Sequence, residues 1–188
     1  MSVRWHRLSW LVAVVGVVAG CTQGGQSPPA SAPSSSTSGE STPESVTPSI
    51  TREVPPAQRQ RLADLPADRL CGLVSPEDLA RLAFPVEPGR PREIGFDPPA
   101  RGCTFNARSG VRSILIGVQP LGYGHLGVKQ VDLGGVRGSK ILHDNDCTVL
   151  ADVMGATLQV AVVAGEADSE QCESAQAVAQ YVVAGVER

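Results

Sequence analysis

The 188-residue chain has few aromatic residues, no long apolar run and no excess of basic residues. Aromatic residues make up 4% of it, and both tryptophans, Trp5 and Trp10, lie near its start. Sugar-binding sites usually stack sugar rings on aromatic faces, so this composition disfavours a glycan-binding module. The formal net charge of −3 argues against nucleic-acid binding and against electrostatic attachment to anionic lipid.

The apolar run near the N-terminus is too short to cross a bilayer. It extends from Leu8 to Gly20, whereas a membrane-spanning helix needs about 20 residues. Arg4 and Arg7 precede it without an acidic residue, which is the charged-then-apolar pattern of a secretory signal peptide. We therefore expect residues 1–20 to be a signal peptide. The residues around its cleavage site indicate that it is a lipoprotein signal peptide.

The stretch Val18-Ala19-Gly20-Cys21 resembles the bacterial lipobox. The resemblance implies diacylglycerol transfer to the sulfur of Cys21, cleavage before Cys21 and acylation of the new amino group. One lipid chain binds a membrane only marginally, at about 0.8 kcal/mol per buried CH₂, but two or three would hold the protein on the outer face of the cell membrane. The alternative is ordinary secretion, with a cysteine close to the cleavage site by chance.

The next segment, residues 21–56, is predicted to be a lipidated cysteine followed by a disordered stalk. Of its 35 residues after Cys21, 24 are Ser, Thr, Pro or Gly. Such a segment buries too little apolar surface to offset the entropy lost on ordering. The remaining residues, 57–188, are long enough for a single domain.

Short patterns predict the secondary structure of this domain. Ser75 is a suitable helix N-cap followed by Pro76, and Pro85 ends that helix. Strands are expected over 103–107 and 111–119, joined by a turn. Alternating apolar residues over 147–162 predict a hairpin with one apolar face. The last segment, about 169–186, is predicted to be a helix with one buried stripe, formed by Cys172, Ala175, Ala179, Val182 and Val186.

Four cysteines remain in the predicted domain, and an even number in an exported chain indicates two disulfides. Cys172 faces the core at the start of the last helix, and Cys147 opens a strand on the same apolar side, so we predict Cys147–Cys172. By elimination, Cys71 pairs with Cys103; free buried thiols are the alternative. The predicted fold is therefore α+β: an antiparallel sheet packed against a short N-terminal helix and a C-terminal helix, with two disulfides.

Four stretches occur in a familiar order: DRLCGLVSPEDLARL, RGCTFNA, NDCTVLADV and SEQCESAQAVAQYV. Together with the lipobox and the stalk, they resemble a family of small actinobacterial lipoproteins that carry a domain of unknown function. The resemblance covers about residues 68–186 and implies an envelope location and an α+β fold. It provides no catalytic residues to transfer.

Two motifs invite a functional interpretation that their context does not support. GYGHLG at 122–127 matches the dinucleotide pattern G-x-G-x-x-G, but Pro120 interrupts the preceding strand and too few residues follow for the packing helix. We interpret it as a glycine-rich loop. His143, Asp144 and Asp146 could ligate Ca²⁺, but the glycine and the distant glutamate of a calcium loop are missing, so we interpret 143–147 as a turn.

Nothing in the sequence indicates catalysis. Outside the predicted signal peptide the histidines are His125 and His143, and there is no G-x-S-x-G motif. The acidic run from Glu166 to Glu173 is expected to cap a helix. We therefore expect a protein that is not an enzyme, with no cofactor and no metal ion.

Three classes of function remain for this chain. The first is a non-catalytic interaction module that binds an envelope protein, and the second is a carrier of an apolar small ligand or lipid. An enzyme is the third and least favoured. Apolar residues on both faces of 111–119 suggest a second covered face or a pocket. An exposed apolar patch would favour the module, and a closed cavity of several hundred Å³ would favour the carrier.

Overall fold

The computed structural model describes residues 42–94 and 99–186. The predicted signal peptide, the lipidation site Cys21 and the first part of the predicted stalk lie outside these residues. No helix within them is long and apolar enough to cross a membrane.

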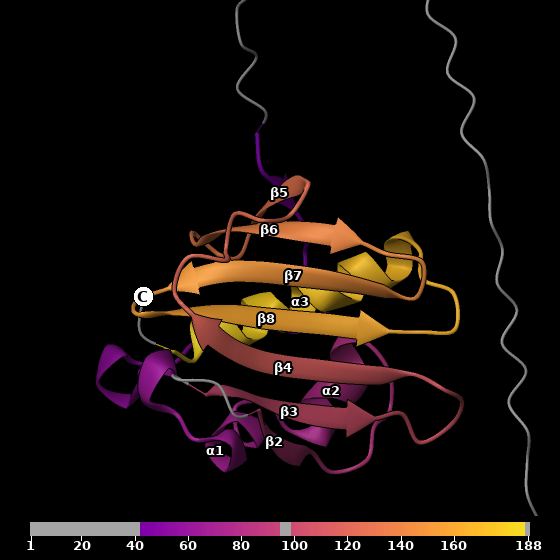
Figure 1. Ribbon diagram of the computed structural model, residues 1–188, viewed down its shortest axis with the longest axis horizontal. Coiled ribbons are helices and arrows are strands. Elements are labelled where there is room, and N and C mark those ends of the chain that lie inside the picture. Colours follow the sequence, from indigo (N-terminus) through magenta and orange to yellow (C-terminus); the bar gives the residue numbers. More distant parts are fainter. Residues whose placement is uncertain (1–41, 95–98, 187–188) are drawn as a thin grey trace, which may run out of the picture. The chain divides into compact units, whose positions relative to one another are not determined.

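One sheet of eight strands forms the centre of the described domain, in the order β1-β5-β6-β7-β8-β4-β3-β2 (Figure 1). The strands are β1 (Glu44–Ser45), β2 (Arg90–Ile94), β3 (Ala100–Asn106), β4 (Ser113–Pro120), β5 (Lys129–Asp132), β6 (Arg137–Leu142), β7 (Asp146–Val153) and β8 (Ala156–Val163). The helices are η1 (Pro56–Gln58), η2 (Leu62–Asp64), α1 (Ala67–Cys71), α2 (Pro76–Leu82) and α3 (Ser169–Ala184).

The fold is α+β, as predicted, with one difference in strand direction. Neighbouring strands are antiparallel from β5 through to β2, whereas β1 pairs with β5 in parallel. The sheet is therefore mixed. The parallel strand is contributed by residues 44–45, which we expected to belong to the stalk.

Residues 44–52, which we expected to belong to the stalk, contact the domain predicted for 57–188. Gln176 donates a hydrogen bond to the carbonyl oxygen of Glu44. The side chain of Arg52 donates to the carbonyl oxygen of Leu73 and lies over the ring of Tyr181. Composition favoured disorder here, but specific hydrogen bonds and an edge position in the sheet stabilise this segment instead.

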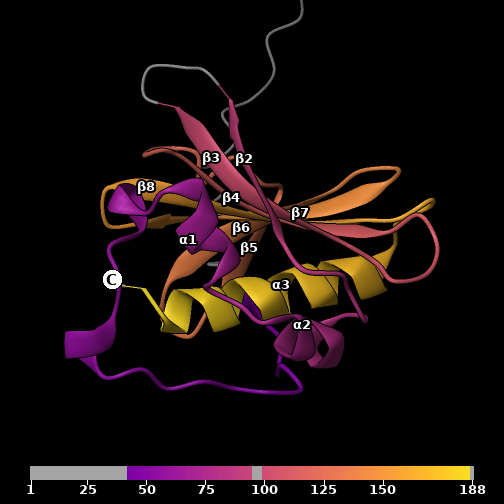
Figure 2. The ribbon, with the colours of Figure 1, turned by 90° about the horizontal axis from the view of Figure 1, so that it is seen from below.

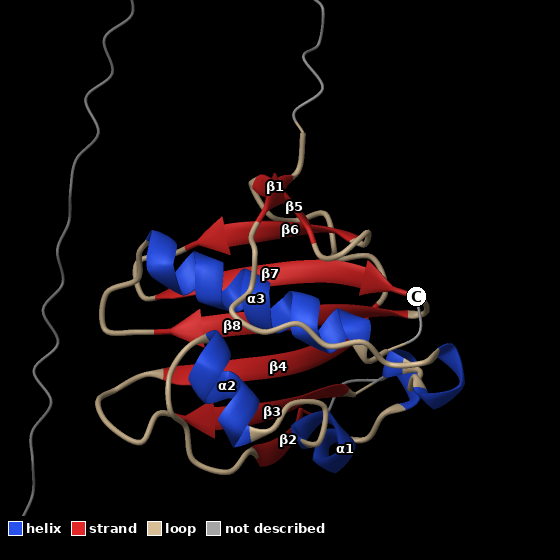
Figure 3. Cartoon of the chain, turned by 180° about the vertical axis from the view of Figure 1, so that it is seen from behind, coloured by secondary structure: helices blue, strands red, loops and turns tan. Residues whose placement is uncertain are grey.

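The helices lie on one face of the sheet (Figures 2 and 3). Helix α3 contacts β6, β7 and β8, and α1 contacts β2 and β3. Buried side chains on this face form the core, among them Phe105, Ile114, Ile116, Val149, Val160 and Val182. We refer to the opposite face as the helix-free face.

The predicted helices and their caps are confirmed. The side chain of Ser75 accepts a hydrogen bond from the backbone N–H of Asp78 at 3.1 Å, and Pro76 opens α2. Asp168 and Gln171 form a capping box at the start of α3, which is the role expected of the acidic run. The predicted stripe of α3 is buried against the sheet.

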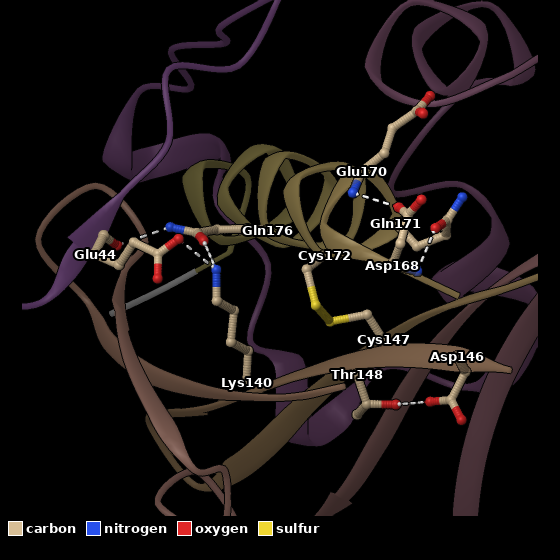
Figure 4. The surroundings of a disulfide bond; sticks show 10 residues. All are labelled: Glu44, Lys140, Asp146, Cys147, Thr148, Asp168, Glu170, Gln171, Cys172 and Gln176. Atoms are coloured by element: carbon tan, nitrogen blue, oxygen red, sulfur yellow. Dashed lines mark hydrogen bonds and ion pairs between the residues drawn. A yellow bond between two sulfur atoms is a disulfide. The ribbon is translucent and has the colours of Figure 1, made fainter. Parts of the chain in front are cut away.

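Both predicted disulfides are present. Cys71 of α1 pairs with Cys103 of β3, and Cys147 of β7 pairs with Cys172 of α3 (Figure 4). They close loops of 32 and 25 residues, each of which stabilises the fold by about 3.5 kcal/mol in the chain-entropy model. Each bridge ties a helix to the sheet.

The predicted hairpin is β7–β8, but side chains on both of its faces are buried. Val149, Val153 and Val160 face the core as expected, yet Leu150, Thr157 and Ala161 on the helix-free face are buried as well. At Thr157 the covering segment is the connection from β4 to β5, since the Tyr123 N–H donates to the Thr157 hydroxyl, and the hairpin pattern could not show this connection.

Candidate functional site

Residues 121–128, the crossing loop, run over the helix-free face of the sheet. They connect β4 to β5, and three strands, β8, β7 and β6, lie between those two in the sheet order. The helices occupy the other face, so the loop passes over this one (Figure 1). It partly covers the second face of the β7–β8 hairpin.

Hydrogen bonds from β6, β7 and β8 hold the backbone of the crossing loop. The Asp152 carboxylate accepts from the N–H of Gly124 at 3.0 Å and from that of Gly122 at 3.3 Å. The Thr157 hydroxyl accepts from the N–H of Tyr123 at 3.1 Å. The Ser139 hydroxyl accepts from the Gly127 N–H at 2.8 Å and donates to the Gly124 carbonyl oxygen at 2.7 Å.

Two of the three glycines of GYGHLG, Gly124 and Gly127, allow this close approach. A Cβ atom on Gly124 would lie 2.5 Å from the backbone nitrogen of Asp152, and one on Gly127 would lie 2.5 Å from that of Lys140. The element that follows is strand β5, not the helix that a dinucleotide site requires. The motif is a loop, as we interpreted it.

Asp152 is the electrostatic anchor of the crossing loop. Partial burial acts to raise the pKa of its carboxyl group, but hydrogen bonds from Thr157, Gly124 and Gly122 outweigh this effect. The pKa of Asp152 therefore lies below its ordinary value. The charged form, which is the better acceptor for these donors, is present at neutral pH.

The crossing loop exposes large apolar side chains although its backbone is fixed. Leu121 is 58% exposed, Tyr123 42%, Leu126 54% and Val128 87%. Four exposed apolar side chains within eight residues are unusual on a surface that remains in contact with water. Clusters of such side chains mark binding sites. This patch is the kind of feature that favours an interaction module.

Beside the crossing loop, the helix-free face carries small, polar and basic side chains. Cys103 and Ile116 are cross-strand partners with no exposed surface, so their neighbours in β3 and β4 point to the other face. The row next to them consists of Arg92, Gly102, Gly117 and Gln159 in register across β2, β3, β4 and β8. A hollow of about 150 Å³ lies over this row.

A second hollow, of about 290 Å³, lies between α3 and the edge formed by β5 and β6. Lys140, whose side chain is 7% exposed, reaches into this cleft from β6. Its ammonium group lies 2.7 Å from the Glu44 carboxylate and 3.4 Å from the side-chain oxygen of Gln176 (Figure 4). Val128, Leu142 and Cys172 supply apolar lining.

The ion pair favours the charged form of Glu44. The hydrogen bond from Lys140 lowers the pKa of Glu44 more than burial raises it, and the charges of Lys140 and Lys129 lower it further. The pKa of Glu44 therefore lies below its ordinary value. This pair joins β1 to the domain.

Of the three residues that could have ligated Ca²⁺, His143 and Asp144 lie in the turn between β6 and β7, and Asp146 is the first residue of β7. The N–H of His143 donates to the carbonyl oxygen of Asp146 at 2.8 Å, and the Asp146 carboxylate accepts from the Thr148 hydroxyl at 2.7 Å. Within 42–94 and 99–186, no three His, Cys, Asp or Glu side chains are grouped as a metal site would require. His125 lies in the crossing loop, apart from His143.

Sequence reasoning missed the residues that build these two hollows. Lys140 and Gln176 are ordinary polar residues in the sequence, and nothing local indicates that they are buried together. Gly117 did offer an indication, because an isolated glycine within a strand pattern marks a bulge or a close approach of another group.

Comparison with known proteins places the chain in a family without assigning an activity. Neither the curated proteins nor the solved structures gave a match. The model of one family, described as a protein of unknown function (DUF3558), matches residues 16–184. This chain therefore belongs to the DUF3558 family of proteins of unknown function.

Proposed function

We propose that this protein is a non-catalytic binding module of the cell envelope, held on the outer face of the membrane by lipid on Cys21, which binds a partner protein on its helix-free face. The observation that carries the proposal is the crossing loop, whose backbone is held while Leu121, Tyr123 and Leu126 are exposed. A fixed backbone lowers the entropy lost on binding, and exposed apolar side chains supply the affinity.

Photo-crosslinking in the producing cell tests the docking face. A photoreactive amino acid replaces Leu126 in the crossing loop, and a matched control replaces Ala80, which is exposed on α2 among the helices. We expect a discrete adduct with one protein from position 126 and none from position 80. Absence of an adduct at 126, or equal adducts at both positions, would refute this docking face.

The lipid anchor has a separate test. Cys21→Ala removes the sulfur that the lipobox resemblance marks for diacylglycerol transfer, so the variant should be released into the medium. Retention of the variant at the membrane would contradict lipid anchoring. This experiment does not depend on the crossing loop.

A carrier of an apolar small ligand is the second candidate, favoured by the cleft between α3 and β6. At about 290 Å³ it is at the lower end of ligand-site volumes. Native mass spectrometry of the protein purified from its own host distinguishes the two functions. A co-purified ligand that is lost in Leu142→Asp supports the carrier, and a mass with no ligand excludes it.

A further inference from the structure

We infer that the hollow over Gly102 and Gly117 is a recognition pocket for one aromatic side chain of the partner protein, next to an acidic residue. The inference rests on the proposed function, because it assigns a specific subsite to the docking face. It starts from Gly117, whose presence in the sheet lacks a structural reason.

Gly117 lies in the middle of β4, where glycine weakens a strand because it has no side chain to pack. A Cβ atom at this position would have its nearest neighbours at 3.7 Å, in the side chain of Gln159, which is an ordinary van der Waals distance. The backbone φ of Gly117 is not positive. The registers of β4 with β3 and with β8 are continuous through it, so it does not form a bulge. Alanine would fit, and what glycine adds is open space.

Gly102 is the cross-strand partner of Gly117, and it widens the same space. Here a Cβ atom would lie 3.2 Å from the Ile116 carbonyl oxygen and 3.2 Å from a methyl carbon of Leu115. Gly102 therefore has a packing reason as well. Together the two glycines leave a floor of bare backbone.

The size of the hollow fits one ring. Its volume is about 150 Å³, and a cavity of roughly this volume holds a benzene molecule. Leu115 gives it an apolar wall, and Gln119 and Gln159, hydrogen-bonded to each other, form the opposite side. An aromatic side chain can stack on a flat peptide floor against such an apolar wall.

The charge at the rim points to an acidic neighbour of that ring. Arg92 of β2 lines the hollow, is exposed, and forms no ion pair within residues 42–94 and 99–186. Arg90 lies on the same face two residues earlier, paired loosely with Glu87 at 3.4 Å. A guanidinium at the rim of an aromatic pocket can lie over the ring or bind a carboxylate in a bidentate manner.

The hollow also adjoins the crossing loop. The hydroxyl of Thr157, which accepts from the Tyr123 N–H, belongs to the cross-strand partner of Gln119. The pocket and the exposed side chains of the loop therefore form one surface. An aromatic anchor at a pocket with apolar contacts around it is the usual arrangement of an interface hot spot.

Titration of the mature chain carrying Cys21→Ser, followed by amide NMR, tests the inference. The probes are acetyl-Asp-Phe-amide, acetyl-Lys-Phe-amide and N-acetylglucosamine. We expect the acidic aromatic probe to shift the amide signals of Gly102 and Gly117 in a saturable manner. Gly117→Val should weaken this binding by about tenfold or more, while the control Gly165→Ala, in open space, should leave it unchanged.

Arg92→Gln should reduce the preference for the Asp probe over the Lys probe to within about twofold. The thermal midpoint of Gly117→Val shows whether that variant is folded, and we expect it not to fall. The inference is overturned if neither aromatic probe shifts Gly102 and Gly117, if the sugar does so instead, or if Gly117→Val binds as the parent does. Shifts that depend on protein concentration without a probe would assign the pocket to a second copy of the chain, which also overturns it.

These outcomes are separable from those of the proposed function. If crosslinking from position 126 succeeds and the titration fails, the partner docks without using the hollow. If the titration succeeds and crosslinking fails, the pocket exists and the docking face proposed for the crossing loop is wrong.

Discussion

The two faces of the sheet are built from alternate residues of the same strands, and they differ in the size and burial of their side chains. On the helix-covered face, β3 and β4 present Cys103, Phe105, Ile114 and Ile116, all at most 1% exposed. On the helix-free face, the same strands present Gly102, Thr104, Leu115 and Gly117. The first set fills the core, whereas glycine at two positions of the second set leaves space open. Under the proposed function, the first face provides stability and the second provides recognition.

The largest expected effect is on the helix-covered face. Phe105→Ala removes a ring that is 1% exposed and should lower the free energy of unfolding by about 3–5 kcal/mol. The neighbouring change Thr104→Ala, on the helix-free face, should cost less than about 1 kcal/mol. Urea denaturation of both variants measures the difference, and similar losses would contradict the division between the faces.

The Cys147–Cys172 disulfide holds α3 on the covered face. Replacing both cysteines by alanine should lower the free energy of unfolding by about 3.5 kcal/mol, from the entropy of the 25-residue loop. Native-state hydrogen exchange should show faster opening of α3 than of the crossing loop. Equal acceleration in both regions would mean that the two faces unfold as one unit.

Asp152 tests how firmly the crossing loop is held on the helix-free face. Asp152→Ala removes the acceptor for Gly122, Gly124 and the Thr157 hydroxyl, and should cost about 1–2 kcal/mol. Hydrogen exchange at the Gly124 amide measures the loosening. Asp152→Asn, which retains an acceptor oxygen, should lose less.

The same anchor has a defined pH dependence. The pKa of Asp152 is lowered from 3.8 in the folded protein, so its contribution to stability is present above pH 3.8. That contribution is lost as the pH falls through the lowered folded pKa. The Gly124 amide shift should therefore show a change in acid below pH 3.8 that is absent from Asp152→Asn, and persistence of that acid change in Asp152→Asn would refute the assignment.

The smallest expected effect has the opposite sign. Gly117→Ala should raise the free energy of unfolding by about 0.5–1 kcal/mol, because alanine fits there and restricts the unfolded chain. Gly102→Ala should be less stable than Gly117→Ala, since its methyl group must displace Leu115. The reverse order in thermal unfolding would remove the argument that Gly117 keeps a pocket open.

Local patterns were sufficient for the elements whose own residues specify them. Ser75 and Pro76 start α2, the stripe through Cys172 and Val182 orients α3, and the alternation around Met154 produces β7 and β8. The two disulfides followed, because the orientation of Cys147 and Cys172 depends only on those elements. The short strands β1, β5 and β6 were missed, since they have too few apolar residues to show a period.

Strand β2 was missed for a related reason. Its sequence, Arg-Pro-Arg-Glu-Ile, has a proline and three charges, which suit an edge strand whose outer side is unpaired. Edge strands depend on the neighbour that pairs with them, here β3. Such pairing is not visible within the segment itself.

The sequence by itself determined the class of fold, the caps of α2 and α3, and the cysteine pairs, because these depend on residues that are close in the chain or share one periodic face. Only the tertiary structure decided that the β4–β5 connection crosses three strands, that Lys140 is buried beside Glu44, and that Gly102 lies opposite Gly117. Each of these depends on strand order and register, which arise from contacts between segments distant in the chain.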